Sequence, residues 1–242
     1  MQQIFVNDNP IDNSFVITGD DMHHLVRVVR LKRGEVIRVS TAAGSNFLCE
    51  VSDITDKELI ATVKEEVPST ELSNKIYLFQ ALPKGDKMET IIEKCVELGV
   101  YEIIPVEMKN CIVKLDDKKK KSKLTRYQTV AATAAKQSKR SIIPQVHDFM
   151  TYKEAFEYAK SLDINLLPYE SKNGMKDTFD VLDSIKQGQS IGVFIGPEGG
   201  FDQSEIDLVK DSCSIISLGR RILRTETAAI CTLSMLMLKC EV

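Results

Sequence analysis

The chain has 242 residues, a mass of 27.2 kDa and a formal net charge of −3, with 43% hydrophobic and 28% charged residues. These values are typical of an ordinary globular protein with one large or two modest domains, and they exclude collagen-like, disordered and disulfide-scaffold chains. The negative net charge also argues against a protein that coats nucleic acid with its whole surface.

Residues 1–70 are predicted to form a small β-rich unit. Short β-branched runs lie at 4–6, 14–18, 35–41, 47–53 and 58–67. Turn residues such as Asn, Asp, Pro and Gly separate them, and one helical insert at 20–31 interrupts them. Many short strands with a single helix predict a small β-barrel.

Residues 71–242 are predicted to alternate strands with helices after a linker at 68–74. Strands are expected at 75–82, 102–106, 164–168, 190–196 and 213–218, and helices from 86, 151 and 202 and at 125–138 and 225–239. The capping pairs of those three starts are Asp86 with Glu89, Thr151 with Glu154, and Asp202 with Glu205. Alternation of this kind predicts an α/β domain with a parallel sheet covered on both faces.

Nothing in the sequence indicates a membrane or metal protein. The apolar segment 228–238 is shorter than the roughly 18–20 residues of a membrane helix, and the N-terminus lacks a secretory signal pattern. Six Cys without a C-x-x-C pair and three His without zinc spacing predict reduced thiols and no metal site. We therefore expect a cytoplasmic protein without a membrane partner.

Positive charge is concentrated in residues 109–140, which hold 11 basic and 2 acidic side chains, whereas the other 210 residues hold 21 basic and 33 acidic ones. A second basic island, 22–38, has 5 basic and 1 acidic side chains, and Arg27 and Arg30 are expected on one face of its helix. Such clusters bind phosphates without reading sequence. The pattern predicts one basic, RNA-binding face, and the alternative is a solvated loop at 118–123.

A glycine-rich loop follows the strand predicted at 190–196. The run Gly196-Pro-Glu-Gly-Gly200 is neither a P-loop nor a dinucleotide fingerprint. Its glycines let a ligand approach the backbone, and ligands bind beyond the carboxyl ends of parallel strands. The loop therefore predicts a pocket suited to an uncharged adenosine, and a simple tight turn is the alternative.

A second loop, 217–228, crowds three arginines next to the start of a helix. Thr225 is predicted to cap this helix, and Glu226 suits its first turn. Arg220, Arg221 and Arg224 are unfavourable at a helix N-terminus unless an anion is bound or develops there. A third strand end, Leu166-Leu-Pro-Tyr-Glu170, could join the other two loops around one pocket.

Together these motifs resemble the RsmE family of small-subunit ribosomal RNA uracil-N3 methyltransferases, in the SPOUT superfamily. The resemblance covers essentially the whole chain and rests on four segments: 24–30 (HLVRVVR), 84–89 (KGDKME) with 97–99 (ELG), 195–200 (IGPEGG) and 218–228 (LGRRILRTETA). It implies a PUA-like barrel, a SPOUT α/β domain tied in a trefoil knot, a homodimer, and S-adenosylmethionine as methyl donor. The implied substrate is one uridine of 16S ribosomal RNA in the small ribosomal subunit.

The resemblance also implies roles for individual residues. The donor site would comprise Leu167, Pro168, Gly196, Glu198, Gly199, Gly200, Leu218, Gly219 and Leu223. RNA would be held by Arg27, Arg30, Lys118, Lys119, Lys120, Lys121, Arg126 and Arg140. One departure stands out, because Lys136 and Lys139 occupy positions where the family often has Glu and Gly.

The implied reaction needs the imide nitrogen of uracil aligned with the donor methyl and a place for the charge released onto O2 and O4. Arg224 and Arg220 are the candidates to stabilise that charge, and Glu226 is a candidate base, although helix capping explains Glu226 equally well. Other readings are an RNA methyltransferase of the same superfamily acting on a ribose 2′-hydroxyl or a tRNA base, and a non-enzymatic ribosome-assembly factor. A nucleotide-dependent oxidoreductase lacks its fingerprint motif.

Overall fold

The structure is a computed structural model that describes residues 1–170 and 174–241. The chain divides into two compact units. The first consists of Met1–Glu71 and Ala135–Ile143, and the second of Leu72–Ala134 and Pro144–Val242. Among the described residues, no helix is both long and apolar enough to cross a membrane.

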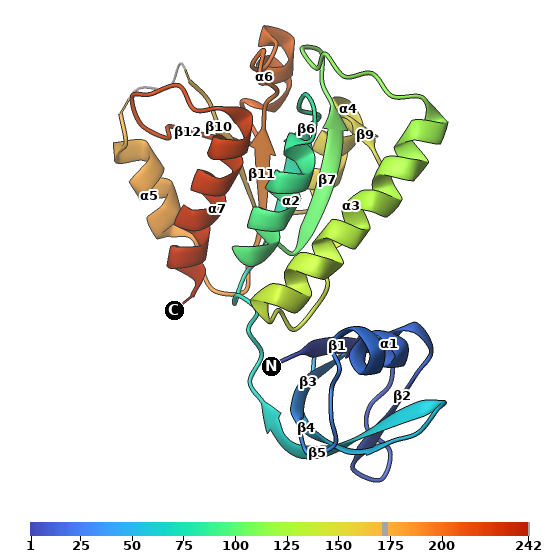
Figure 1. The fold of residues 1–242 in the computed structure, drawn as a ribbon. Helices are drawn as coiled ribbons and strands as arrows, with labels where there is room; N and C mark the ends of the chain where they lie inside the picture. Colours follow the sequence, from blue (N-terminus) through green and yellow to red (C-terminus); the bar gives the residue numbers. More distant parts are fainter. Residues whose placement is uncertain (171–173, 242) are drawn as a thin grey trace. The chain divides into compact units, whose positions relative to one another are not determined.

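The first unit is built on a five-stranded sheet (Figure 1). Its elements are β1 (Gln3–Val6), β2 (Ser14–Thr18), α1 (Gly19–His23), the π-helical turn η1 (His24–Val28), β3 (Val36–Thr41), β4 (Asn46–Ile54) and β5 (Glu58–Val67). The strand order is β1-β3-β4-β5-β2, in which only the β1–β3 pair is parallel. Within the described residues β1 and β2 are not paired with each other, so the predicted barrel is an open sheet around its own apolar core.

The helical insert differs from the regular helix predicted at 20–31. The α-helix ends at His23, and in the π turn that follows the Val29 N–H donates to the His24 carbonyl (2.9 Å), five residues back. Arg30 lies beyond the helix with φ +61°, a left-handed conformation that is uncommon outside glycine. Arg27 and Arg30 therefore do not share a regular helix face, and that expectation was wrong.

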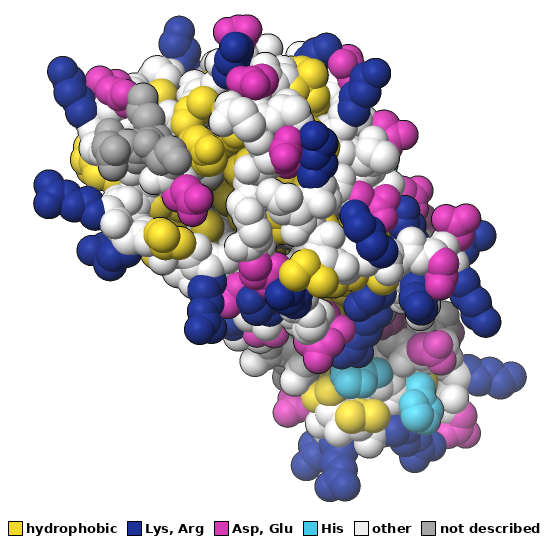
Figure 2. All heavy atoms as spheres, turned by 90° about the horizontal axis from the view of Figure 1, so that it is seen from above, with side chains coloured by type: hydrophobic (Ala, Val, Ile, Leu, Met, Phe, Trp, Pro, Cys, Tyr) yellow, Lys and Arg dark blue, Asp and Glu magenta, His cyan; other side chains and the backbone are white. Residues whose placement is uncertain are grey.

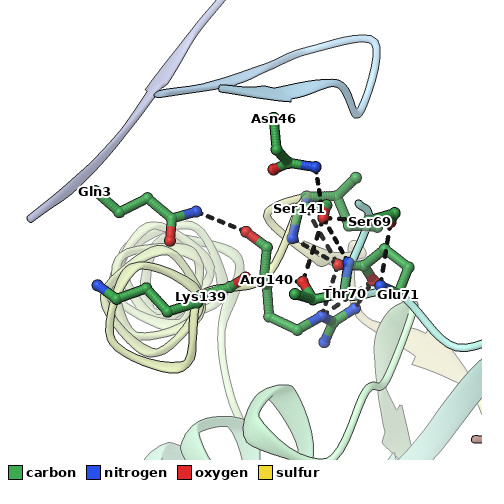
Figure 3. A network of polar contacts seen from close by, with 9 residues as sticks. Gln3, Asn46, Ser69, Thr70, Glu71, Lys139, Arg140 and Ser141 are labelled. Carbon is green, nitrogen blue, oxygen red and sulfur yellow. Dashed lines mark hydrogen bonds and ion pairs between the residues drawn. The ribbon is translucent and has the colours of Figure 1, made fainter. Parts of the chain in front are cut away.

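A polar network fastens residues 135–143 to the rest of the first unit (Figure 3). Arg140 is only 3% exposed and pairs with Glu71, which accepts from its Nε (2.9 and 3.0 Å) and from the Ser141 N–H (2.8 Å). On the sheet side, Gln3 Nε2 donates to the Arg140 carbonyl (2.7 Å) and Asn46 Nδ2 to the Ser141 hydroxyl (2.9 Å). Arg140 is thus a structural residue, which argues against the phosphate contact predicted for it.

The second unit is an α/β layer structure. Its elements are β6 (Lys75–Ala81), α2 (Lys87–Glu97), β7 (Glu102–Glu107), α3 (Asp117–Ser138), β8 (Gln145–Val146), β9 (Met150–Thr151), α4 (Tyr152–Ala159), β10 (Ile164–Pro168), α5 (Lys176–Ser184), β11 (Ser190–Ile195), α6 (Gln203–Val209), β12 (Ser214–Ile216) and α7 (Thr225–Cys240). The sheet order is β12-β10-β11-β6-β7-β8, β9 also pairs with β7, and every one of these pairs is parallel. The predicted parallel sheet is confirmed.

Side chains alternate across the central strand β6, as the twofold period of a strand requires. Phe79 is buried with Phe194 and with Tyr152 and Phe156 of α4. On the opposite face, Gln80 bonds to the first residue of α7. Figure 1 agrees with this layering, because α2 and α7 lie side by side in front of the sheet and α4 lies behind it.

The helix starts in this unit were predicted with mixed success. The capping boxes at Thr151 and Asp202 are confirmed. The box at Asp86 was wrong, because Asp86 makes no side-chain cap bond. Helix α3 begins at Asp117, before the predicted start at 125, so the lysine-rich stretch 118–123 is helical and the alternative of a loop there was wrong.

Thr225 does not cap α7, because Arg224 occupies the N-cap position and Thr225 is the first helical residue. The Thr225 hydroxyl instead donates to the Gly196 carbonyl (2.7 Å) and accepts from Gln80 Nε2 (3.0 Å). These two bonds, one buried and one partly buried, tie the end of β6, the loop after β11 and the start of α7 together.

We predict that Glu71→Ala destabilises the first unit by about 2–4 kcal/mol, because it leaves the buried Arg140 guanidinium without its carboxylate. The shift in the denaturation midpoint, followed by hydrogen exchange in residues 1–71, measures the effect. Glu50→Ala, which breaks an exposed pair with Lys64, is the matched control and should change the midpoint much less. Equal effects of the two substitutions would contradict a structural role for Arg140.

We also predict that Thr225→Val, which keeps the shape but removes the hydroxyl, lowers the free energy of unfolding by about 1–3 kcal/mol. The cause is the loss of the bonds to Gly196 and Gln80. Denaturant unfolding measures the loss. Thr225→Ser keeps the hydroxyl and should retain most of the stability, so an equal loss in both variants would assign the effect to packing instead.

Candidate functional site

Three loops meet at the carboxyl ends of β10, β11 and β12. These strands belong to one parallel stretch of the sheet, so their ends lie at the same edge. The loops enclose a cavity of about 280 Å³. Eight residues predicted for the site line it: Pro168, Gly196, Glu198, Gly200, Leu218, Gly219, Leu223 and Arg224.

Four other predicted residues are near the cavity but do not line it. Leu167 is fully buried in β10. At Gly199 an added Cβ would lie 3.1 Å from Asn110 Cβ, so this glycine allows a close approach to the loop after β7. Arg220 is exposed outside the lining, and the carboxylate of Glu226 lies 3.4 Å from Lys87 Nζ.

Sequence reasoning missed several lining residues. They are Tyr169, Glu170, Ile195, Pro197, Phe201, Arg221, Ile222, Thr225 and Ala228. Tyr169 and Glu170 belong to the third strand end, 166–170, in which the sequence motifs predict no role for these two residues. Most of the others are sequence neighbours of predicted residues. A rule that takes the residues within about six positions after these three strands would have found most of them, but not Ile195 of β11 or Thr225 and Ala228 of α7.

Two glycines shape the cavity because they adopt left-handed backbone conformations. Gly200 has φ +70° and Gly219 has φ +101°. A residue with a side chain is strained in this region, and Gly is not. The glycine signal in both loops therefore has a direct conformational reason.

The arginine cluster is open to solvent. Arg220, Arg221 and Arg224 are all exposed, and among the described residues none of them pairs with a carboxylate. Arg224 also caps the positive end of the α7 dipole, where a cation is disfavoured. Both the arginine side chains and the positive end of the α7 dipole are therefore available beside the cavity to bind a negatively charged group.

Glu198 of the glycine-rich loop is held by the start of α2. Its Oε1 accepts from Lys87 Nζ (2.9 Å) and from the Lys84 N–H (3.1 Å). Burial alone would raise the pKa of Glu198, but the bonds from Lys87 and from backbone N–H groups outweigh it, so the net pKa is lowered. Glu198 is therefore a carboxylate at neutral pH.

The first unit has a separate cavity of about 520 Å³ on its helical insert. Met22, Val26 and Ile54 line it and also pack against the core, while Arg27 and His23 line it with polar groups. Arg27 and Arg30 are both exposed, so these two predicted RNA contacts are accessible.

The basic tract, residues 109–140, carries less unpaired positive charge than its sequence suggests. Five of its cations, besides the Arg140–Glu71 pair, have acidic partners: Lys109 with Asp202, Lys119 with Asp116, Lys120 with Glu107, Arg126 with Glu89, and Lys136 with Asp21. On the face drawn in Figure 2, Lys and Arg are interspersed with Asp and Glu. The single basic face predicted from the sequence is not found there. Lys118 and Lys121 are exposed.

The departure at residues 136 and 139 has a structural reading. Lys139 has φ +63°, the conformation that explains why a glycine suits this position. Its Nζ donates to the Met1 carbonyl (2.9 Å), a bond that a glycine cannot make. Lys136 pairs with Asp21 (3.5 Å), where Glu would be repelled.

The described residues offer no cluster of His, Cys, Asp or Glu that could hold a metal ion. All six cysteines are free, and five of them are buried, as predicted for reduced core thiols.

Comparison with known proteins gives the same picture over the whole chain. Residues 70–237 match the family described as RNA methyltransferase domain, and residues 17–64 match the RNA methyltransferase PUA domain. The chain is 36% identical over 226 residues to ribosomal RNA small subunit methyltransferase E of Bacillus subtilis, covering 91% of this chain and 88% of that protein. It is 35% identical over 232 residues to the enzyme of the same name from Mesomycoplasma hyopneumoniae, covering 95% and 96%.

A solved structure is similar as well. Ribosomal RNA small subunit methyltransferase E from Neisseria gonorrhoeae, bound to S-adenosylmethionine, is 27% identical, with a TM-score of 0.80 over 97% of this chain and 96% of that one. The expected α/β methyltransferase domain and PUA-like domain are thereby confirmed. The chain belongs to the RNA methyltransferase family that contains ribosomal RNA small subunit methyltransferase E.

Proposed function

We propose that this protein methylates N3 of one uridine in 16S ribosomal RNA of the small ribosomal subunit, with S-adenosylmethionine as donor. The observation that carries the proposal is the cavity at the carboxyl ends of β10, β11 and β12, whose lining includes both loops on which the family resemblance rests most specifically. The relatives named above support the RNA and the donor, and the resemblance of the motifs supports the uracil nitrogen.

The residues around the cavity fit this donor. Its volume of about 280 Å³ is close to the lower end of the ~300–1,000 Å³ range of small-molecule sites. Pro168, Leu218 and Leu223 provide apolar walls for a nucleoside, and Glu170 and Glu198 are carboxylates suited to a cationic ligand. When bound, S-adenosylmethionine would supply an electrophilic methyl group.

The chain's own residues would then have two tasks. The loops align the donor with the uracil nitrogen, and alignment contributes up to about 7–11 kcal/mol in well-oriented systems. Arg224, which lines the cavity and is free of carboxylates among the described residues, would stabilise the charge that develops on the uracil oxygens. Arg220 does not line the cavity, so Arg224 is the first candidate for this role.

The two units would divide the work. We propose residues 1–70 as the PUA-like RNA-binding domain and 71–242 as the SPOUT methyltransferase domain, with the trefoil knot of that superfamily. We also propose a homodimer, because α7 carries exposed or half-exposed apolar side chains at Ile230, Met235, Met237 and Leu238. We propose that the protein is located in the cytoplasm, where ribosomes are found.

We predict that Arg224→Ala lowers the rate of methyl transfer to small subunits lacking the modification by about 10²–10³-fold, as removal of one oxyanion donor does elsewhere. Labelled donor and identification of the modified nucleoside measure the rate and the product. Lys210→Ala, an exposed cation on the C-cap of α6, should leave the rate unchanged. A ribose-methylated product, or equal rates for wild type and Arg224→Ala, would reject the mechanism.

We also predict that Arg27→Ala weakens RNA binding and lowers the slope of log affinity against log salt by about 0.7–0.9, the value expected for one lost phosphate contact. Fluorescence titrations with a 16S fragment at several salt concentrations measure the slope. Lys64→Ala, which removes an exposed cation paired with Glu50, is the control and should keep the wild-type slope. An unchanged slope for Arg27→Ala would remove this side chain from the RNA contact.

A further inference from the structure

One sequence motif has no role in the function proposed above. The segment 84–89 (KGDKME) carries part of the family resemblance, yet none of its residues lines the cavity. It lies in the turn before α2 and in the first turn of that helix. Its contacts in the structure explain why it accompanies the two cavity loops.

Lys87 contacts the loop after β11 and the start of α7 through two carboxylates. Its Nζ lies 2.9 Å from Glu198 Oε1, in the loop after β11, and 3.4 Å from Glu226 Oε2, in the first turn of α7. All three side chains are only partly exposed, at 32% for Lys87, 26% for Glu198 and 20% for Glu226. An ion pair with such limited exposure is screened less than a surface pair.

The carboxylate of Glu226 depends on this contact. Its Oε2 is buried without a hydrogen-bond partner among the described residues, and Lys87 is the one cation within 4 Å of it there. Without Lys87 this buried oxygen would be an uncompensated charge, which is unfavourable. Glu226 does not line the cavity, although its neighbour Thr225 does.

We propose that Lys87 is a positioning residue that joins Glu198 and Glu226, and so fixes the spacing of the two donor-binding loops, and that Glu226 acts in this clamp and not as a base. The proposal deepens the proposed function and rests on it. A second group of the motif acts on the same carboxylate, because the Lys84 N–H also donates to Glu198 Oε1 (3.1 Å).

The two roles of Glu226 lead to different kinetics. A base acts on the reacting atoms, so its loss lowers kcat, by about 10²–10⁴-fold, and alters the dependence of kcat on pH. A clamp acts on the shape of the donor site, so its loss weakens donor binding and leaves the pH dependence of kcat in place. Lys87 and Glu226 would then be energetically coupled, because they act through one contact.

The test compares Lys87→Met, Glu226→Gln, the double variant and Lys87→Arg in the full-length protein. Calorimetry with S-adenosylmethionine gives the donor Kd, and methyl transfer to small subunits from about pH 6 to about pH 9 gives kcat and KM. We expect Lys87→Met and Glu226→Gln each to raise Kd and the donor KM about tenfold, with kcat changed less than about threefold. The double variant should bind no more weakly than Lys87→Met, and Lys87→Arg should recover most of the affinity.

Lys94→Met is the matched control. Lys94 is on the same helix and, in the described part of the chain, pairs with Glu93 and Glu97 alone, so its loss should leave Kd within about twofold of wild type. A wild-type Kd in Lys87→Met, or additive losses in the double variant, would overturn the clamp. So would a large fall of kcat in Glu226→Gln with an altered pH profile. Wild-type protein that binds the donor but modifies no uridine would reject the proposed function alone, because the comparison of Kd values stands without RNA.

Discussion

The hydroxyl of Thr225 is the contact on which the arrangement of the second unit depends. It joins Gln80 at the end of the central strand to the Gly196 carbonyl at the end of the neighbouring strand, and it does so from the first residue of α7. A parallel sheet brings strand ends to one edge, but it does not by itself fix the loops beyond them. The two bonds of this hydroxyl do, and the Lys87 ion pairs repeat the connection on the solvent side.

Sequence patterns predicted the architecture well where a single physical signal dominated. Alternating apolar strands and capped helices identified the parallel sheet, and the capping boxes at Thr151 and Asp202 were correct in detail. The glycine-rich loop was recognised because three glycines in five residues exceed what a turn needs. Eight predicted cofactor or catalytic residues line the cavity because they lie at the ends of strands that share an edge or in the loops that follow them.

The errors arose where a side chain has two competing uses. Thr225 has the right chemistry for an N-cap, yet its hydroxyl is engaged by groups distant in sequence, which no local pattern reveals. Asp86 and Glu89 have the spacing of a capping box, but Glu89 pairs with Arg126 on α3. Arg140 resembled a phosphate ligand until its carboxylate partner, Glu71, was found 69 residues away. Charge counted along the chain overstates the unpaired positive charge of residues 109–140, because most of their acidic partners lie outside that segment.

The pairing of β6 with β11 has a consequence for how the protein is made. Lys75 pairs with Ser190, so the central strand is synthesised long before this neighbour, and every residue that lines the cavity lies after residue 167. At ribosomal rates of about 5–20 residues per second, β6 waits on the order of ten seconds for that partner. During this interval one edge of an apolar strand is unpaired, and the first unit, whose last segment ends at Ile143, becomes complete in sequence before β11 is made. The first unit can therefore fold on the ribosome before the residues that line the cavity have been made.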